Sequence, residues 1–134
     1  MRSAFRFTAS LLSLAVVVQV GFAGYGAFHA IDKADHASVT KKTIENGFDP
    51  HGFLGSIIVV LMIVLVVIAL VGRIKIRVAA ILLALGIVQM LLAWGASSAA
   101  WVGFFHGVNA LLIAGLAGSL AGAEWREARV ASTA

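Results

Sequence analysis

The chain has 134 residues, of which 61% are hydrophobic and 12% charged, with a formal net charge of +4 and no cysteine. Soluble domains carry roughly 25% charged residues, so this composition indicates an integral membrane protein. Without cysteine the chain has no disulfides, thiolate metal ligands or iron–sulfur clusters. The basic residues are too few for a nucleic-acid-binding face, and polar residues are too scarce to line the water-filled cleft of a self-sufficient enzyme.

Four apolar segments are long enough to cross a bilayer, which needs about 20 residues. The predicted spans are residues 7–28, 50–72, 78–97 and 100–123. An outer polar connection, 29–49, a basic turn, 73–77, and a polar tail, 124–134, complete the single domain 1–134. We predict an all-α fold, an integral membrane four-helix bundle. A secretory signal peptide is the alternative interpretation of the first span.

The second span carries the most informative pattern. Asp49 is a favourable helix N-cap and Pro50 suits the first helical position, so we expect the helix to begin there. His51 would then lie at the mouth of a membrane-spanning helix, with Gly52 and Gly55 further in.

Lysine and arginine are distributed unevenly between the two predicted sides. The side with the termini and the 73–77 turn has seven of the ten, and the opposite side has three. The positive-inside rule therefore predicts a multi-pass protein of a bacterial-type cell membrane with both termini in the cytoplasm. All four histidines fall on or near the outer side: His29, His36, His51 and His106.

The two predicted hairpins resemble one another, which favours a duplication. Residues 18–23 (VQVGFA) resemble residues 88–93 (VQMLLA), and residues 51–58 (HGFLGSII) resemble residues 106–113 (HGVNALLI). Tandem hairpins of this kind are related by a pseudo-two-fold axis along the membrane normal. That axis places Gln19 onto Gln89 and His51 onto His106.

Two histidines from different spans at similar depth suit the axial positions of a b-type haem. A flat macrocycle between helices also needs small residues near its ligands. We therefore predict haem b as the cofactor and His51 and His106 as the metal ligands. The candidate cofactor-binding residues are His51, His106, Gly24, Gly55, Gly103 and Gly107.

Several alternatives remain open at this stage. His29 is a rival ligand, and zinc completed by Asp49 or His29 is a rival metal site. Gln19 and Gln89 suit hydrogen bonds that hold helices together, or a quinone- or proton-handling site. Asn109 suits either orienting a ligand or bonding a neighbouring backbone. A cofactor-free structural or accessory subunit of a membrane complex is the remaining class.

The segment from His51 to Gly55, together with His106, resembles one four-helix half of heme A synthase, over roughly residues 8–123. In that family each half carries a histidine at the outer end of its second and fourth helices. The chain also resembles small uncharacterised four-span bacterial membrane proteins with the same histidine pair.

The chain departs from the synthase pattern, because Asp49 precedes His51 where the family has a catalytic glutamate and Gly52 follows where it has arginine. One bundle also has room for one haem only. The resemblance therefore implies haem-binding architecture rather than the synthase reaction. We expect electron transfer or haem handling near the outer leaflet, with the lipid bilayer as its surroundings and a redox partner protein or a quinone as its partner.

Overall fold

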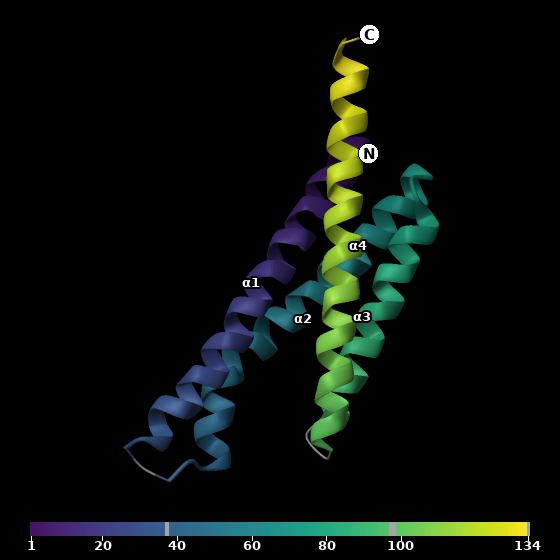
Figure 1. The fold of residues 1–134 in the computed structure, drawn as a ribbon. Coiled ribbons are helices and arrows are strands. Elements are labelled where there is room, and N and C mark those ends of the chain that lie inside the picture. The colour runs from purple at the N-terminus through teal and green to yellow at the C-terminus, as the bar shows by residue number, and fades with distance from the viewer. Residues whose placement is uncertain (37, 97–98, 134) are drawn as a thin grey trace.

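The computed structural model describes residues 1–36, 38–96 and 99–133, which form four helices and no strand (Figure 1). The helices are α1 (Arg2–Ala34), α2 (Lys41–Gly72), α3 (Ile76–Ala96) and α4 (Ala100–Thr133). All four are long and apolar enough to cross a membrane. The prediction of an all-α bundle is confirmed, and the chain is a multi-pass membrane protein in architecture.

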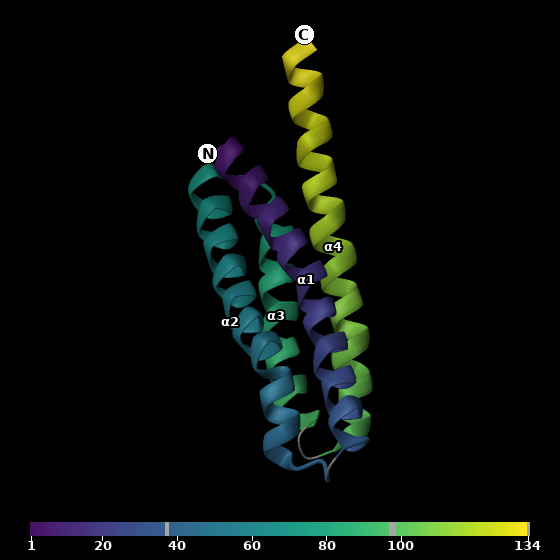
Figure 2. The same cartoon turned by 90° about the vertical axis from the view of Figure 1, so that its left-hand side faces the viewer.

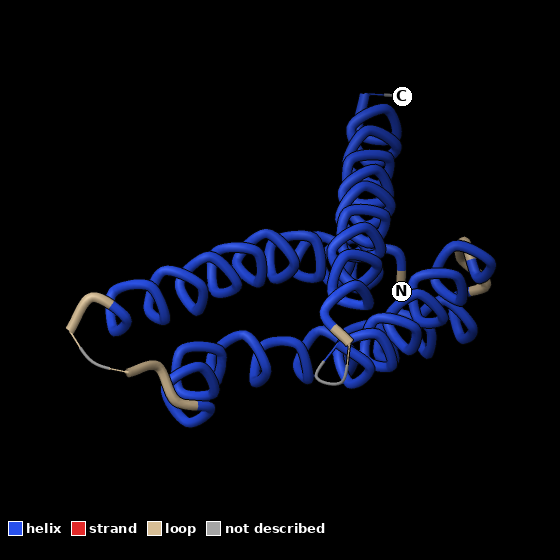
Figure 3. The backbone as a smooth tube through the Cα atoms, turned by 60° about the horizontal axis from the view of Figure 1, so that its bottom comes forward, coloured by secondary structure: helices blue, strands red, loops and turns tan. Residues whose placement is uncertain are grey.

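The expected start of the second span at Pro50 is wrong. Helix α2 begins at Lys41, where the Thr40 hydroxyl accepts from the backbone N–H of Thr43 in a capping box. Pro50 therefore lies inside the helix, where it cannot donate the usual hydrogen bond to residue 46. The first turns of α2 run in a different direction from the rest of the helix (Figure 3), as expected near an internal proline.

Much of the predicted 29–49 connection is consequently helical, because α1 also continues to Ala34. The Thr40 cap competes successfully with Asp49 for the start of α2. The predicted end of the third span at Ser97 lies outside the described residues.

The helices form a ring in which each packs against two neighbours: α1 against α2, α2 against α3, α3 against α4, and α4 against α1. The diagonal pairs, α1 with α3 and α2 with α4, do not pack together within the described ranges. Both termini and the α2–α3 turn lie at one end, which we call the basic end (Figures 1 and 2). The opposite end, with the other two connections, is the histidine end.

The apolar core is concentrated between the middle of the bundle and the basic end. Its most deeply buried side chains come from the first half of α1, the second half of α2, the first half of α3 and the later turns of α4. They are Phe5, Ala9, Leu12, Met62, Leu65, Ala69, Ala79, Leu82 and Ala117. Towards the histidine end the α1–α2 hairpin diverges from the α3–α4 hairpin (Figure 1).

An ionic cluster closes the basic end. Arg73 and Lys75 have positive φ values of 53° and 43°, which turn the chain tightly between α2 and α3. The Lys75 ammonium lies 2.6 Å from the buried Glu124 carboxylate and 2.7 Å from that of Glu127. Burial would lower the pKa of Lys75, but its hydrogen bonds with the two carboxylates and their negative charges outweigh this and raise it.

Replacing the lysine tests this cluster. Lys75→Met leaves the Glu124 carboxylate buried without its cation, so we expect the free energy of unfolding to fall by about 2 kcal/mol, less than for a fully buried pair. The hydrogen bonds and charges of the cluster raise the pKa of Lys75 and lower the pKa of Glu127. The cluster therefore stabilises the wild type at neutral pH, and this is lost as pH rises through the Lys75 pKa or falls through the Glu127 pKa. Unfolding in detergent micelles measures both effects. Adding Glu124→Gln to Lys75→Met should recover most of the lost free energy of unfolding. A double variant as unstable as Lys75→Met alone would contradict the pairing.

Candidate cofactor site between the hairpins

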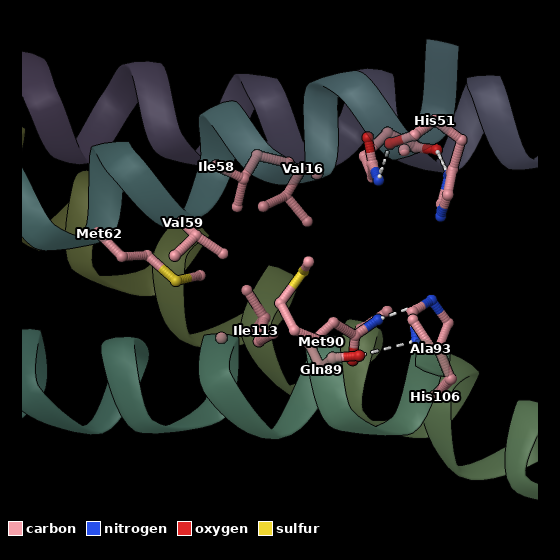
Figure 4. Close-up of a pocket in the computed structure, with 15 residues that line it drawn as sticks. Val16, His51, Ile58, Val59, Met62, Gln89, Met90, Ala93, His106 and Ile113 are labelled. Carbon is pink, nitrogen blue, oxygen red and sulfur yellow. Dashed lines mark hydrogen bonds between the residues drawn. The ribbon is translucent and has the colours of Figure 1, made fainter. Parts of the chain in front are cut away.

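His51 on α2 and His106 on α4 face one another across the bundle (Figure 4). Their ring centroids are 6.1 Å apart and the ring planes are inclined by 58°. Two imidazoles on opposite sides of one metal ion have centroids roughly 6 Å apart, since each metal–nitrogen bond is about 2 Å. Diagonally opposite helices thus bring the two rings to the spacing that a shared metal ion requires.

Each imidazole is held by the backbone of the preceding helix in its own hairpin. Nδ1 of His51 lies 3.1 Å from the carbonyl oxygen of Gln19, and Nδ1 of His106 lies 3.2 Å from that of Gln89. A carbonyl oxygen only accepts, so both Nδ1 atoms carry the proton and both Nε2 atoms have a lone pair. Metal-binding histidines usually have this outer-shell arrangement, which fixes the ring orientation.

The second hairpin adds a side-chain network to this bond. The amide nitrogen of Asn109 donates to the Leu85 carbonyl at 3.0 Å and to Oε1 of Gln89 at 2.7 Å. The Gln89 amide is thereby oriented with its nitrogen 3.1 Å from Nε2 of His106. Because that Nε2 atom has no proton, Gln89 donates and His106 accepts. Asn109 therefore acts on His106 through Gln89, and it also bonds a neighbouring backbone.

The first hairpin handles its glutamine differently. Nε2 of Gln19 donates to the backbone carbonyl of His51 at 2.8 Å, and Oε1 of Gln19 is buried without a partner in the described structure. The position that matches Asn109 is Leu54, which offers no donor. A Cβ atom at Gly55 would lie 3.1 Å from the Gln19 nitrogen, so this glycine provides the room for the amide.

Two cavities flank the histidine pair. A cavity of about 120 Å³ is lined mainly by α2 and α3, and another of about 510 Å³ is lined mainly by α1 and α4. The larger volume is within the roughly 300–1,000 Å³ of small-molecule sites. Six residues contribute to the lining of both cavities: Val16, Gln19, His51, Gln89, His106 and Ala110. Together they make a slot between the hairpins, interrupted at the imidazoles.

The predicted glycines divide among these cavities. Gly55 lines the smaller cavity, and Gly103 and Gly107 line the larger. Gly24 lines neither, although it lies on α1 with nothing within 4 Å of a Cβ built on it.

The other two histidines lie away from the slot. His29 stacks on Tyr25, with centroids 5.8 Å apart, and packs against Gly47 on α2. His36 is exposed beyond the end of α1. Among the described residues there is no group of three or more His, Cys, Asp or Glu side chains that could hold a metal ion. The zinc alternative therefore lacks the third protein ligand that it needs.

Sequence reasoning missed Phe48, which contacts the His51 ring edge-on with centroids 6.1 Å apart. Phe48 is seated on Gly26, where an added Cβ would lie 2.8 Å from its ring. The sequence predicts a polar connection over residues 29–49, which includes Phe48, because it favours a helix start at Pro50. The position that matches Phe48 in the second hairpin is Gly103, so His106 has no corresponding aromatic cover. The N-cap at Thr40 is the sequence signal that puts Phe48 on α2.

No protein-family model, curated protein or solved structure matches this chain. The resemblance to heme A synthase thus stays a prediction carried by the histidine pattern alone.

Two glycine substitutions test the geometry of the slot. Gly55→Ala pushes the Gln19 amide away from the His51 carbonyl, and we expect it to lower the free energy of unfolding by about 1 kcal/mol, the worth of one hydrogen bond. Gly107→Ala is the matched control, since a Cβ there meets nothing within 4 Å. It should leave the empty protein as stable as the wild type or slightly more so. Equal effects of the two substitutions on thermal unfolding would contradict this assignment.

Proposed function

We propose that this protein binds one b-type haem between its hairpins, with Nε2 of His51 and of His106 as the axial ligands. The observation that carries the proposal is the shared Nδ1–H to carbonyl bond, which turns both unprotonated Nε2 atoms away from their anchoring carbonyls. The hydrogen bond to the backbone fixes the orientation of each ring before a metal binds, so the site is pre-organised for ligation.

The slot offers what a flat, largely apolar macrocycle needs. Its walls are mostly aliphatic, with Val16, Ile58 and Ile113 among them (Figure 4). Gly55, Gly103 and Gly107 also line it and add no side chain near the histidines. When bound, haem would supply one-electron redox chemistry. The chain's own contribution is to hold both imidazoles, to exclude water with its apolar walls, and to keep the hairpins apart at the histidine end.

The hydrogen-bonding state of the imidazoles favours a metal over a quinone. Both Nε2 atoms are acceptors, and the carbonyl oxygens of a quinone are acceptors too, so these atoms repel rather than bond. A metal ion instead requires two lone pairs. One N–H of the Gln19 amide and one of the Gln89 amide are already used in the hydrogen bonds described above.

By the positive-inside rule, the distribution of basic residues supports an orientation with the histidine end at the outer leaflet and both termini in the cytoplasm. A haem there suits electron transfer between a redox partner at the outer surface and quinone in the bilayer, or the handling of haem itself. We infer an electron-transfer or haem-binding protein rather than an enzyme that completes a reaction alone.

The absorbance spectrum of protein purified from haem-replete cells tests the proposal. We expect a Soret band and the low-spin spectrum of bis-imidazole haem, with one haem per chain. His51→Ala and His106→Ala should each abolish that spectrum. His29→Ala and His36→Ala are matched controls, because each removes an imidazole that lies away from the slot. Both variants should retain the haem spectrum.

Protein that is colourless as purified, and that gains no Soret band when titrated with haemin, would contradict the proposal. A normal spectrum in both the His51→Ala and His106→Ala variants would contradict the ligand assignment. Stabilisation by quinone but not by haem would support the quinone-handling alternative. A folded protein that responds to neither would indicate the accessory-subunit alternative.

A further inference from the structure

The two halves of the slot are not equivalent, although the hairpins match at Gln19 and Gln89 and at His51 and His106. Nε2 of His106 accepts a hydrogen bond from Gln89 at 3.1 Å. Within the described residues no hydrogen bond reaches Nε2 of His51. One of the two candidate ligand atoms is therefore occupied by Gln89, and the other accepts no hydrogen bond from the part of the chain that the structure describes.

The direction of every bond in the occupied half follows from chemistry. Leu85 contributes a backbone carbonyl, which can only accept, so the Asn109 atom beside it is the donating nitrogen. That same nitrogen bonds Oε1 of Gln89 at 2.7 Å, which leaves the Gln89 nitrogen to face His106. Flipping either amide would place two donors or two acceptors together. The Gln89 amide is thus oriented by Asn109.

We propose that Gln89 is a latch on His106: its amide occupies the ligand atom of that imidazole while the slot is empty and must be displaced before His106 can bind a metal. The inference rests on the proposed function, and Gln89 and Asn109 are positioning residues in it. His51 has no latch, because Leu54 replaces Asn109 and Gly55 lets the Gln19 amide turn to the backbone.

The latch makes His51 the first ligand and His106 the exchangeable one. The surroundings of the two rings support this order. Both rings line the larger cavity, but Phe48 packs edge-on against His51, whereas the position that matches it beside His106 is Gly103, which has no side chain. An exogenous ligand of reduced haem, such as carbon monoxide, should accordingly replace His106, because the freed Nε2 atom is recaptured by Gln89.

The latch itself is tested on the haem-free protein by ¹⁵N NMR of the histidine side chains. In wild type we expect Nε2 of His106 to have the shift of a hydrogen-bonded acceptor. Gln89→Leu should move it to the value of a free lone pair, and Asn109→Leu should move it part of the way. Gln19→Leu makes the same change of polarity in the other hairpin and should leave the His106 resonance in place.

Haem titration provides the second measurement. Removing the competing hydrogen bond with Gln89→Leu should tighten haem binding roughly two- to tenfold and weaken carbon monoxide binding by a similar factor. Asn109→Leu should act in the same direction and less strongly. Gln19→Leu, the control for a more apolar slot, should produce neither change.

An unchanged His106 resonance in Gln89→Leu would overturn the latch, as would equal gains in haem affinity from Gln89→Leu and Gln19→Leu. If wild-type protein binds no haem, the proposed function fails by its own test. The NMR comparison on haem-free protein still decides whether Gln89 occupies His106.

Discussion

The candidate site depends on one bond made twice, from the Nδ1–H of a histidine to the backbone carbonyl of a glutamine on the preceding helix. A helical carbonyl already accepts from the N–H four residues on, but its second lone pair remains available. In the apolar interior of a membrane protein, a polar imidazole needs such a partner. The same bond sets the tautomer, aims the ring and ties the two helices of each hairpin together.

The bundle is tight at one end and open at the other, and this gradient makes room for the site. Apolar side chains such as Leu12, Met62 and Leu82 are fully buried in the basic half, where Lys75 and Glu124 also join the α2–α3 turn to α4. With that half closed, the hairpins can diverge at the histidine end without losing the core. Both cavities contact His51 and His106, and the smaller one extends inward as far as Met62.

The hairpins follow a common plan that is broken at the positions next to the histidines. Leu54 and Gly55 in one hairpin stand where Asn109 and Ala110 stand in the other. Each pair suits the glutamine of its hairpin. Gly55 leaves room for the Gln19 amide to donate to the His51 backbone carbonyl, and Asn109 orients the Gln89 amide toward His106. A symmetric scaffold thereby presents two chemically different imidazoles to one slot.

The four apolar runs were sufficient to predict four spans. The paired histidine motifs were sufficient to predict which two imidazole rings face one another. The length of each apolar run and the position of each histidine along its own span are local properties, so the sequence by itself determined them. It could not determine where α2 begins, because Thr40 and Asp49 are both good caps and only packing of Phe48 and Gly47 against α1 selects the earlier one. Nor could it assign the bonds of Gln19, Gln89 and Asn109. Those depend on which groups the two helices of each hairpin bring within about 3 Å of one another, and only the tertiary structure decides that.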